Sequence, residues 1–280
     1  MSPKFNYNHS NVSLLISDWL CLLEKMVEDL VSMNFKRKYI RKQKIRKEKR
    51  RIEKLRKRAK EREKIEHMLQ EGSYLDKRLL KQNIKDKVAL ALQNGIKLCI
   101  DCTYESCMTS KEHKKLAQQI CRAYGANRKY QSPASLHLVN YQPDGPIAKA
   151  CMDKCDGFEG YCMGKHCSSP HELFGKYKEI VYLSPDADDP LLSMSEDCVY
   201  VIGGLVDEHV MRGKSLNEAN SKKCRALRLP VCEFAEKHGA AKPKNPVLAI
   251  NQVVDIVLRY LNNGQNWSDA LSVVPKRLLR

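Results

Sequence analysis

The sequence lacks several features that would point to common protein classes. It contains no run of 18 or more uncharged apolar residues, which argues against a transmembrane helix. With 13 Gly and 11 Pro, these two residue types make up only 24 of 280 positions, which excludes collagen-like and linker-dominated chains. An early apolar stretch, residues 12–23, is interrupted by Asp18 and has neither a basic leader nor a small-residue cleavage site. We therefore do not expect a secretory signal peptide.

The usual nucleotide-binding signatures are missing as well. No G-x-G-x-x-G sequence follows an apolar run, and there is no G-x-S-x-G sequence. Residues 160–165 resemble a phosphate-binding loop that ends in Gly164-Lys165. The motif requires its first glycine at position 159, however, and that residue is Glu. These absences weaken the case for an ordinary dinucleotide-binding protein or NTPase.

Cysteine, by contrast, is abundant, with twelve residues. Without a secretory signal they do not indicate a disulfide scaffold, so we expect a reducing compartment, the nucleus or the cytoplasm. Four of them lie among apolar neighbours and are predicted to be small core residues: Cys99, Cys121, Cys198 and Cys232.

Positive charge is concentrated in one segment. Residues 36–66 carry eighteen Lys and Arg against five Glu, a net charge of +13, whereas the whole chain has +17 and the rest only +4. A basic block attached to a near-neutral body is typical of a polyanion-binding arm, and we expect nucleic acid to be the polyanion. Arg50 and Arg51, within this block, are candidate RNA contacts. A solvated helix face and a nuclear-import signal are the alternatives.

Composition divides the chain into three parts. In residues 1–35 some apolar side chains have helical spacing, and we expect a weakly ordered segment there; a docking or targeting helix is the alternative. Residues 36–72 are dominated by good helix formers and predict a long, exposed, basic RNA-binding helix that ends at Gly72. Residues 73–280 are predicted to form the folded domain.

Short apolar runs alternate with helical segments from about residue 94 onward. Strands are predicted at residues 96–101, 136–139, 180–183, 198–202 and 227–231. Helices are predicted at residues 111–124, with Gly125 as the stop, and at residues 246–261, beginning with Pro246. The alternation predicts an α/β fold whose parallel sheet is covered on both faces. In such sheets ligands bind beyond the carboxyl ends of the strands.

Two carboxylates follow predicted strands. Asp101 ends the first of them, and Asp207 comes shortly after the pair Gly203-Gly204. Paired glycines after a buried strand allow the backbone to approach a ligand closely, which would aim Asp207 into the crevice. The alternative is that Asp207 caps the following turn, as Asp residues at strand ends often do.

A cluster of cysteines lies between residues 151 and 167, with two histidines nearby. The cysteines are Cys151, Cys155, Cys162 and Cys167. Their spacing does not match the paired C-x2-C arrangement of a tetrahedral zinc site. We expect a cysteine-rich loop without metal and keep a metal site as the alternative.

Residues 200–208, Tyr-Val-Ile-Gly-Gly-Leu-Val-Asp-Glu, resemble a motif of the tRNA position-nine purine N1-methyltransferases, a family of the SPOUT superfamily. Other segments resemble further motifs of that family in the same order: 98–101, 119–128, 181–186, 228–230, 247–253 and 267–276. The resemblance covers about residues 50–277, and the stretch 151–167 departs from the family's pattern.

This resemblance implies a SPOUT-type parallel sheet with a C-terminal trefoil knot, S-adenosylmethionine as cofactor, and tRNA as the partner of a monomer. The implied cofactor residues are Leu183, Gly203, Leu229, Leu248 and Ala249. Asp207 is the implied general base, and Asp101 is the next candidate catalytic residue. Arg122 and Arg128, on and just after the helix that is expected to end near Gly125, are candidate phosphate contacts.

The implied chemistry depends on which purine is methylated. Guanine N1 carries a proton at neutral pH and must lose it to a base such as a carboxylate, whereas adenine N1 has a free lone pair and needs only positioning. Two other functions stay open at this point. One is a catalytically inactive tRNA-binding module of the same fold, and the other is a zinc-containing RNA-binding scaffold.

Overall fold

A computed structural model of the 280-residue chain describes residues 9–70, 77–206, 213–237 and 247–274. The chain forms two compact units, residues 1–75 and residues 76–280, which we call unit 1 and unit 2. None of the described helices combines the length and the apolar character needed to cross a membrane.

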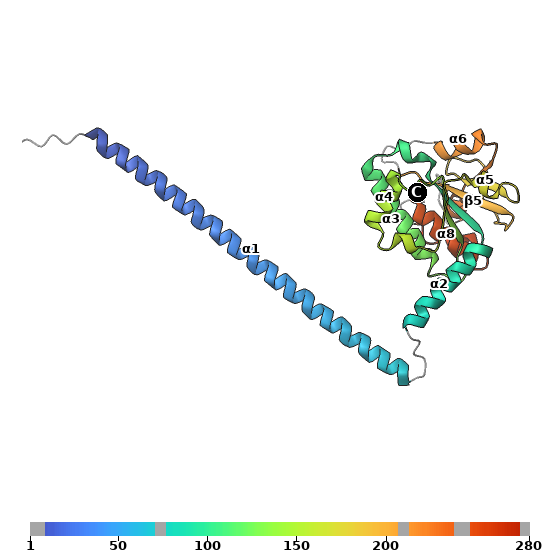
Figure 1. Ribbon diagram of the computed structural model, residues 1–280, viewed down its shortest axis with the longest axis horizontal. Coiled ribbons are helices and arrows are strands. Elements are labelled where there is room, and N and C mark those ends of the chain that lie inside the picture. Colours follow the sequence, from blue (N-terminus) through green and yellow to red (C-terminus); the bar gives the residue numbers. More distant parts are fainter. Residues whose placement is uncertain (1–8, 71–76, 207–212, 238–246, 275–280) are drawn as a thin grey trace, which may run out of the picture. The chain divides into compact units, whose positions relative to one another are not determined.

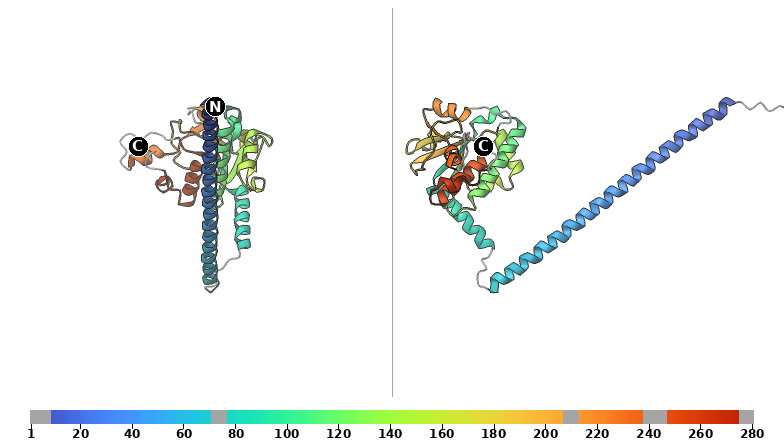
Figure 2. Two further views of the ribbon diagram at one scale, coloured as in Figure 1. Left: turned by 90° about the vertical axis from the view of Figure 1, so that its left-hand side faces the viewer. Right: turned by 180° about the vertical axis from the view of Figure 1, so that it is seen from behind.

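Unit 1 contains one long helix, α1 (His9–Gln70) (Figures 1 and 2). The helix begins within the segment that the sequence predicts to be weakly ordered, and it continues without interruption through the basic block. Every side chain from residue 38 to residue 64 is exposed. The few apolar residues in this stretch, such as Ile45, Ile52 and Leu55, are too sparse to form a buried stripe.

Unit 2 is built on a parallel sheet of six strands in the order β3-β2-β1-β5-β4-β6. The strands are β1 (Lys97–Asp101), β2 (Ser135–Val139), β3 (Gly164–Lys165), β4 (Glu179–Leu183), β5 (Cys198–Gly203) and β6 (Arg225–Leu227). The two central strands are mostly apolar and buried, β1 between its ends Lys97 and Asp101 and β5 from Val199 to Ile202, as expected for strands covered on both faces.

Helices cover both faces of the sheet. They are α2 (Lys77–Asn94), α3 (Ser110–Asn127), α4 (Pro146–Lys154), α5 (Pro170–Phe174), α6 (Lys214–Ser221), α7 (Val231–Lys237), α8 (Ile250–Asn262) and α9 (Trp267–Leu271), with short 3-10 turns η1 (Cys102–Cys107) and η2 (Phe158–Gly160). The larger core packs α3, α4 and α8 against one face, and a smaller core packs α5 and α6 against the other (Figure 1).

Strand alternation divides the side chains between the two cores. Leu98 and Ile100 of β1 enter the larger core, whereas Cys99 enters the smaller one. Asp101 therefore lies on the same face of the sheet as Cys99, the face covered by α6. Leu183, at the end of β4, belongs to the larger core.

Four of the five predicted strands are confirmed, and the fifth, predicted at residues 227–231, is displaced. The strand found there, β6, ends at Leu227, Arg228 forms one further parallel bridge with Pro190, and α7 begins at Val231. Gly125 does not stop α3, which continues to Asn127. Helix α8 begins at Ile250 rather than at Pro246, which lies outside the described residues.

Candidate functional site

The strand order places a crevice at the carboxyl ends of β1 and β5. From β1 the chain crosses over to β2 on one side, and from β5 it crosses over to β6 on the other. Adjacent strands whose connections diverge in this way open a binding crevice beyond their carboxyl ends. Asp101 and Gly203 are paired across this point, so the two sequence-predicted strand ends meet there.

The Asp101 carboxyl is completely buried. Its Oδ1 accepts a hydrogen bond from the backbone N–H of Thr103 (3.1 Å), where it caps η1, and another from Asn140 Nδ2 (2.7 Å). Its Oδ2 has no partner among the described residues. Burial raises the pKa of Asp101 and outweighs the opposing effect of both hydrogen bonds.

The two glycines after β5 differ in what they approach. The N–H of Gly204 donates to the Asp101 carbonyl (2.8 Å), and a Cβ at Gly204 would lie 2.4 Å from that oxygen. At Gly203 a Cβ would meet the Tyr104 ring at 3.4 Å, an ordinary contact. Gly204 thus serves the close approach of two strands, whereas the sequence alone associates both glycines with a ligand.

The predicted cofactor residues gather at the same edge. Leu183 ends β4, next to β5 on one side and β6 on the other, and Leu229 follows β6. Both are buried in the larger core, and Leu248 packs against that core from the segment before α8. Ala249 is the N-cap of α8, and its N–H donates to the side chain of Gln252 (2.9 Å). The edge is therefore lined by apolar side chains and loop backbone.

Asp207 lies outside the described residues, which resume at Gly213. The described residues on either side of this gap, Val206 and Gly213, are hydrogen-bonded near the edge of the sheet. The N–H of Val206 donates to the Met108 sulfur (3.4 Å), and the N–H of Gly213 donates to Asp186 Oδ2 (2.8 Å).

Two polar residues at this edge have roles that the sequence does not reveal. Gln119 on α3 accepts a hydrogen bond from the N–H of Ile250 (2.8 Å), which holds the first turn of α8 beside the site. The two residues are 131 positions apart, and no local pattern indicates their contact. Asn140, the partner of Asp101, has φ of 51°. An Asn directly after a strand is a recognisable turn signal that could have singled it out.

A groove of about 540 Å³ runs between the end of α3 and α8, and it carries three basic side chains: Arg122, Lys129 and Arg259. Arg259 is paired with Asp255 (3.5 Å), whereas Arg122 and Lys129 are exposed. Arg128 is also exposed, and its guanidinium lies over the Tyr124 ring, 5.7 Å from the centroid. Arg122 therefore lines this groove, and Arg128 is exposed at the C-cap of α3.

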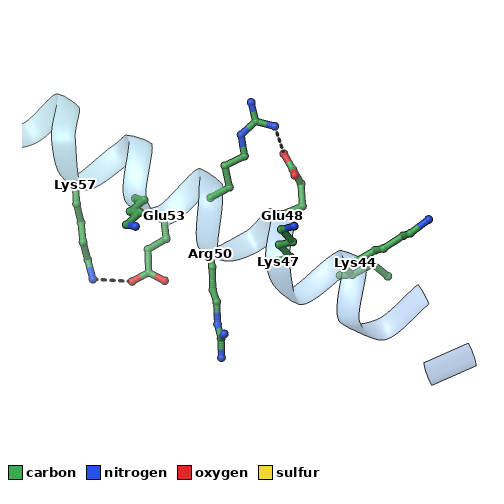
Figure 3. A pocket seen from close by; sticks show the side chains of 9 residues that line it. Lys44, Lys47, Glu48, Arg50, Glu53 and Lys57 are labelled. Atoms are coloured by element: carbon green, nitrogen blue, oxygen red, sulfur yellow. Dashed lines mark ion pairs between the residues drawn. The ribbon is translucent and has the colours of Figure 1, made fainter. Parts of the chain in front are cut away.

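Arg50 and Arg51 lie in unit 1, in a stretch of α1 where basic side chains outnumber acidic ones. Figure 3 shows this stretch, with Arg50 labelled. Glu48 pairs with Arg51 (3.8 Å), and Glu53 pairs with Lys57 (2.9 Å). All four side chains are more than half exposed, so these pairs contribute little to stability and compete weakly with a polyanion.

The four cysteines between residues 151 and 167 do not converge on one point. Cys151 and Cys155 are buried, Cys162 is half-buried and Cys167 is exposed. Across the described residues, no group of three or more His, Cys, Asp or Glu side chains is placed to hold a metal ion. Among the four predicted core cysteines, Cys99 is fully buried and the other three are half-buried.

A family model described as tRNA (guanine(9)-N(1))-methyltransferase TRM10/TRM10A matches residues 29–279. The chain is 35% identical over 218 residues to tRNA methyltransferase 10 homolog B of Bos taurus and 37% identical over 200 residues to the same protein of Danio rerio. These alignments cover 77% and 70% of this chain, and the chain spans 68% and 63% of the respective relatives.

Solved structures show the same fold. A full-length spTrm10–SAH complex superposes on this chain with a TM-score of 0.57 and 28% identity, covering 66% of this chain and 95% of that one. A second structure, spTrm10(74), gives a TM-score of 0.55 and 26% identity, covering 64% and 94%.

Proposed function

Because the chain belongs to the TRM10/TRM10A family of tRNA (guanine(9)-N(1))-methyltransferases, we propose that it methylates N1 of guanine at position 9 of tRNA with S-adenosylmethionine as methyl donor. The observation that carries this proposal is the family match over residues 29–279, which includes every strand at the candidate site. An enzyme of this class explains why the sequence has no glycine-rich nucleotide fingerprint.

The residues at the edge of the sheet fit S-adenosylmethionine. The adenosine half of the cofactor has a flat apolar ring, and Leu183, Leu229 and Leu248 present apolar surface around the ends of β4, β5 and β6. Gly203 and Ala249 would complete the site with backbone and small side chains. The bound cofactor supplies a methyl group on a positively charged sulfur. A related structure that contains SAH, the product left after methyl transfer, supports this assignment.

Asp207 is the residue to which we assign the proton transfer. Guanine N1 must lose its proton as it attacks the methyl group, and a carboxylate within hydrogen-bond reach accepts it. Asp207 follows Gly203, the last residue of β5, by four residues in the sequence. Asp101 is the second candidate. Its complete burial and its two hydrogen bonds suit a residue that holds η1 and Asn140 better than one that touches guanine.

The tRNA backbone would contact both units. In unit 1 the exposed basic face of α1, including Arg50 and Arg51, supplies charge for many phosphates. In unit 2, Arg122 and Lys129 line the groove beside α8, and Arg128 lies on the adjacent turn. Such contacts fix the position of the RNA, whereas the crevice selects the base.

The family resemblance also leads us to propose a C-terminal trefoil knot and a monomeric enzyme. Light scattering of the purified chain, alone and with tRNA, tests the second point, and a dimer mass would overturn it.

Methyl transfer tests the proposed function directly. The full chain is incubated with radiolabelled S-adenosylmethionine and unmodified tRNA transcripts that carry G9, A9 or C9, and nucleoside mass spectrometry locates the methyl group. We expect 1-methylguanosine at position 9 of the G9 transcript. Binding of both SAH and tRNA without any transfer would favour the inactive tRNA-binding module. Stoichiometric zinc without SAH binding would favour the metal-containing scaffold.

A further inference from the structure

Gly125 occupies a helical position where neither the backbone nor the packing requires a glycine. It lies inside α3, in the part of the helix that lines the groove beside α8. It does not adopt a positive φ, and a Cβ at this position would meet no heavy atom of a neighbouring element within 4 Å. Glycine destabilises a helix relative to alanine, so the fold alone does not explain this residue. What the missing side chain does provide is open space in the groove.

Two basic side chains flank Gly125 at helical spacing. Arg122 precedes it by three residues and Lys129 follows it by four, and all three residues line the same groove. Both basic side chains are exposed, and neither has an ion-pair or hydrogen-bond partner among the described residues. Their charges are therefore available to an anionic group that enters the groove.

Asp255, the carboxylate among the described residues that line the groove, is already neutralised. Its Oδ1 accepts a hydrogen bond from the Tyr130 hydroxyl (2.8 Å), and its Oδ2 lies 3.5 Å from Arg259 Nε. Burial and this carboxylate raise the pKa of Tyr130 to about 12, so the hydroxyl keeps its proton and remains a donor to Asp255. The groove therefore has an excess of positive charge, together with two flat groups, the Tyr130 ring and the Arg259 guanidinium.

The size and chemistry of the groove fit one nucleotide of a single strand. Its volume of about 540 Å³ is in the range of small-molecule sites and larger than a phosphate group alone would fill. The backbone of a duplex can contact a basic surface without any hollow in it. Single-stranded RNA, by contrast, presents unstacked bases that pack against aromatic rings and guanidinium planes. The groove combines such flat groups with basic side chains for the phosphates.

We propose that this groove holds one unstacked nucleotide of the bound RNA, separate from the base that is methylated, and that Gly125 keeps the space open for it. The chain enters β2 at Ser135, six residues after Lys129, so this end of the groove lies near the amino end of a strand, away from the crevice. The inference rests on the proposed function, because methylation of a base requires taking it out of its stack, which also unstacks its neighbours. The groove gives one of these neighbours a new stacking partner.

Photo-crosslinking of the full chain to a G9 tRNA transcript that contains 4-thiouridine tests the proposal without S-adenosylmethionine. Mass spectrometry then identifies the peptides that carry a nucleotide. We expect a cross-link within residues 122–130. A single-stranded RNA with 4-thiouridine should give the same cross-link, whereas the same strand in a duplex should not. Gly125→Leu fills the hollow, so it should remove the cross-link and weaken tRNA binding about ten-fold, as for the loss of one stacked base.

Gly160→Leu is the matched control. Gly160 also lacks a positive φ, and a Cβ there would also meet no heavy atom within 4 Å, but this residue lies in η2, outside the groove. Its cross-link and tRNA affinity should match those of the unsubstituted chain. Gly125→Ala tests whether the fold needs the glycine, and we expect it to raise Tm by about 2–4 °C.

The salt dependence of tRNA binding separates the base contact from the phosphate contact. Gly125→Leu removes no charge and should leave the log–log slope unchanged, whereas Lys129→Gln should make it shallower by about 0.7, the value for one phosphate of a single strand. Equal tRNA affinities for Gly125→Leu and Gly160→Leu, an equally strong cross-link to the duplex, or an unchanged slope for Lys129→Gln would each overturn the proposal. If 1-methylguanosine still forms in that case, the proposed function stands without the groove. Cross-linking at the groove without methyl transfer would instead overturn the proposed function and leave the groove as an RNA site.

Discussion

Gly203 and Gly204 are neighbours in sequence, but substitution at each should have a different effect. A methyl group at Gly204 would lie 2.4 Å from the Asp101 carbonyl, which is backbone and cannot move without disturbing β1. A methyl group at Gly203 would make an ordinary contact with Tyr104. We expect Gly204→Ala to lower the free energy of unfolding by about 1–3 kcal/mol and Gly203→Ala to leave it nearly unchanged. Urea denaturation of the two variants gives the comparison, and equal losses would contradict this interpretation of the glycine pair.

Substitution of Asp207 distinguishes a base from a binding residue. Asp207→Asn keeps the shape of the side chain and removes the proton acceptor, so the single-turnover rate on a G9 tRNA should fall about 10²–10⁴-fold. Raising the pH should restore part of the rate, because solvent then helps to remove the N1 proton. On an adenine target the loss should be small and nearly independent of pH.

The control for Asp207→Asn is ligand affinity, measured by calorimetry with SAH and by tRNA titration. Both affinities should match those of the unsubstituted chain. If SAH binding disappears, Asp207 positions the cofactor, and Asp101 becomes the candidate base.

At the scale of elements, the turn between β6 and α7 is held by a forked ion pair. The two terminal nitrogens of Arg228 donate to the two carboxylate oxygens of Glu233 at 2.8 and 2.7 Å. This hydrogen bonding lowers the pKa of Glu233. The pair brackets Leu229, a proposed cofactor residue, so we expect Glu233→Gln to weaken SAH binding about five-fold, equivalent to about 1 kcal/mol.

Glu179→Gln provides the matched control for this turn. Glu179 forms a longer, exposed ion pair (3.9 Å) with Arg225, which begins the same strand β6 at its other end. Calorimetry should show unchanged SAH affinity for this variant. A similar loss of SAH affinity in Glu233→Gln and Glu179→Gln would mean that removing charge anywhere along β6, rather than at its turn to α7, weakens binding.

Helix α1 should supply affinity for tRNA rather than chemistry. Deleting residues 1–70 should weaken tRNA binding and flatten its salt dependence, because each lost phosphate contact removes about 0.9 from the log–log slope on a duplex and less on a single strand. SAH binding by unit 2 should persist. Fluorescence titrations over a range of salt concentrations give the slope, and an identical slope for both chains would assign α1 to targeting or to a solvated face.

At the scale of the whole molecule, stability should depend on pH through His137. This side chain is nearly buried between Ser135 (2.9 Å) and His166 (3.1 Å), and burial lowers its pKa from 6.5 to about 4. Between these two values the unfolded chain binds the proton and the folded chain does not. The contribution of His137 to the free energy of unfolding is therefore complete above 6.5, its pKa in the unfolded chain, and is lost as the pH falls toward 4, its pKa in the folded chain. From pH 7 to pH 5 we expect the free energy of unfolding to fall by about 2 kcal/mol from this residue.

The measurement is urea denaturation at both pH values, with His137→Gln as comparison. The variant should show a smaller decrease than the unsubstituted chain. An equal decrease would assign the pH dependence to other groups.

The sequence predicts much of the sheet because its strands are short apolar runs of a kind that only a covered parallel sheet can bury. It also identifies both ends of the crevice, Asp101 and Gly203, because strand ends in such sheets share one edge. The prediction that the helix stops at Gly125 is wrong, because a glycine inside α3 is tolerated where the flanking turns are packed.

Contacts over long sequence distances could not be predicted. Nothing near Gln119 indicates that its side chain holds the N–H of Ile250, and nothing near Ala117 indicates that its carbonyl accepts a hydrogen bond from the Cys155 thiol. Both contacts exist because α3 packs against α4 and α8, a property of the tertiary fold and not of any local pattern.

The packing of α8 on α3 also sets an order in time during synthesis. Gln119, Tyr130 and Ser132 are bonded to residues 131, 125 and 130 positions further along the chain. A nascent chain that has not yet released α8 from the ribosome therefore leaves the apolar face of α3 uncovered and the crevice without its last wall. Such distant contacts slow folding. The polypeptide becomes competent only after α8 has been synthesised, and products that stop before α8 carry the basic helix without a complete edge of the sheet.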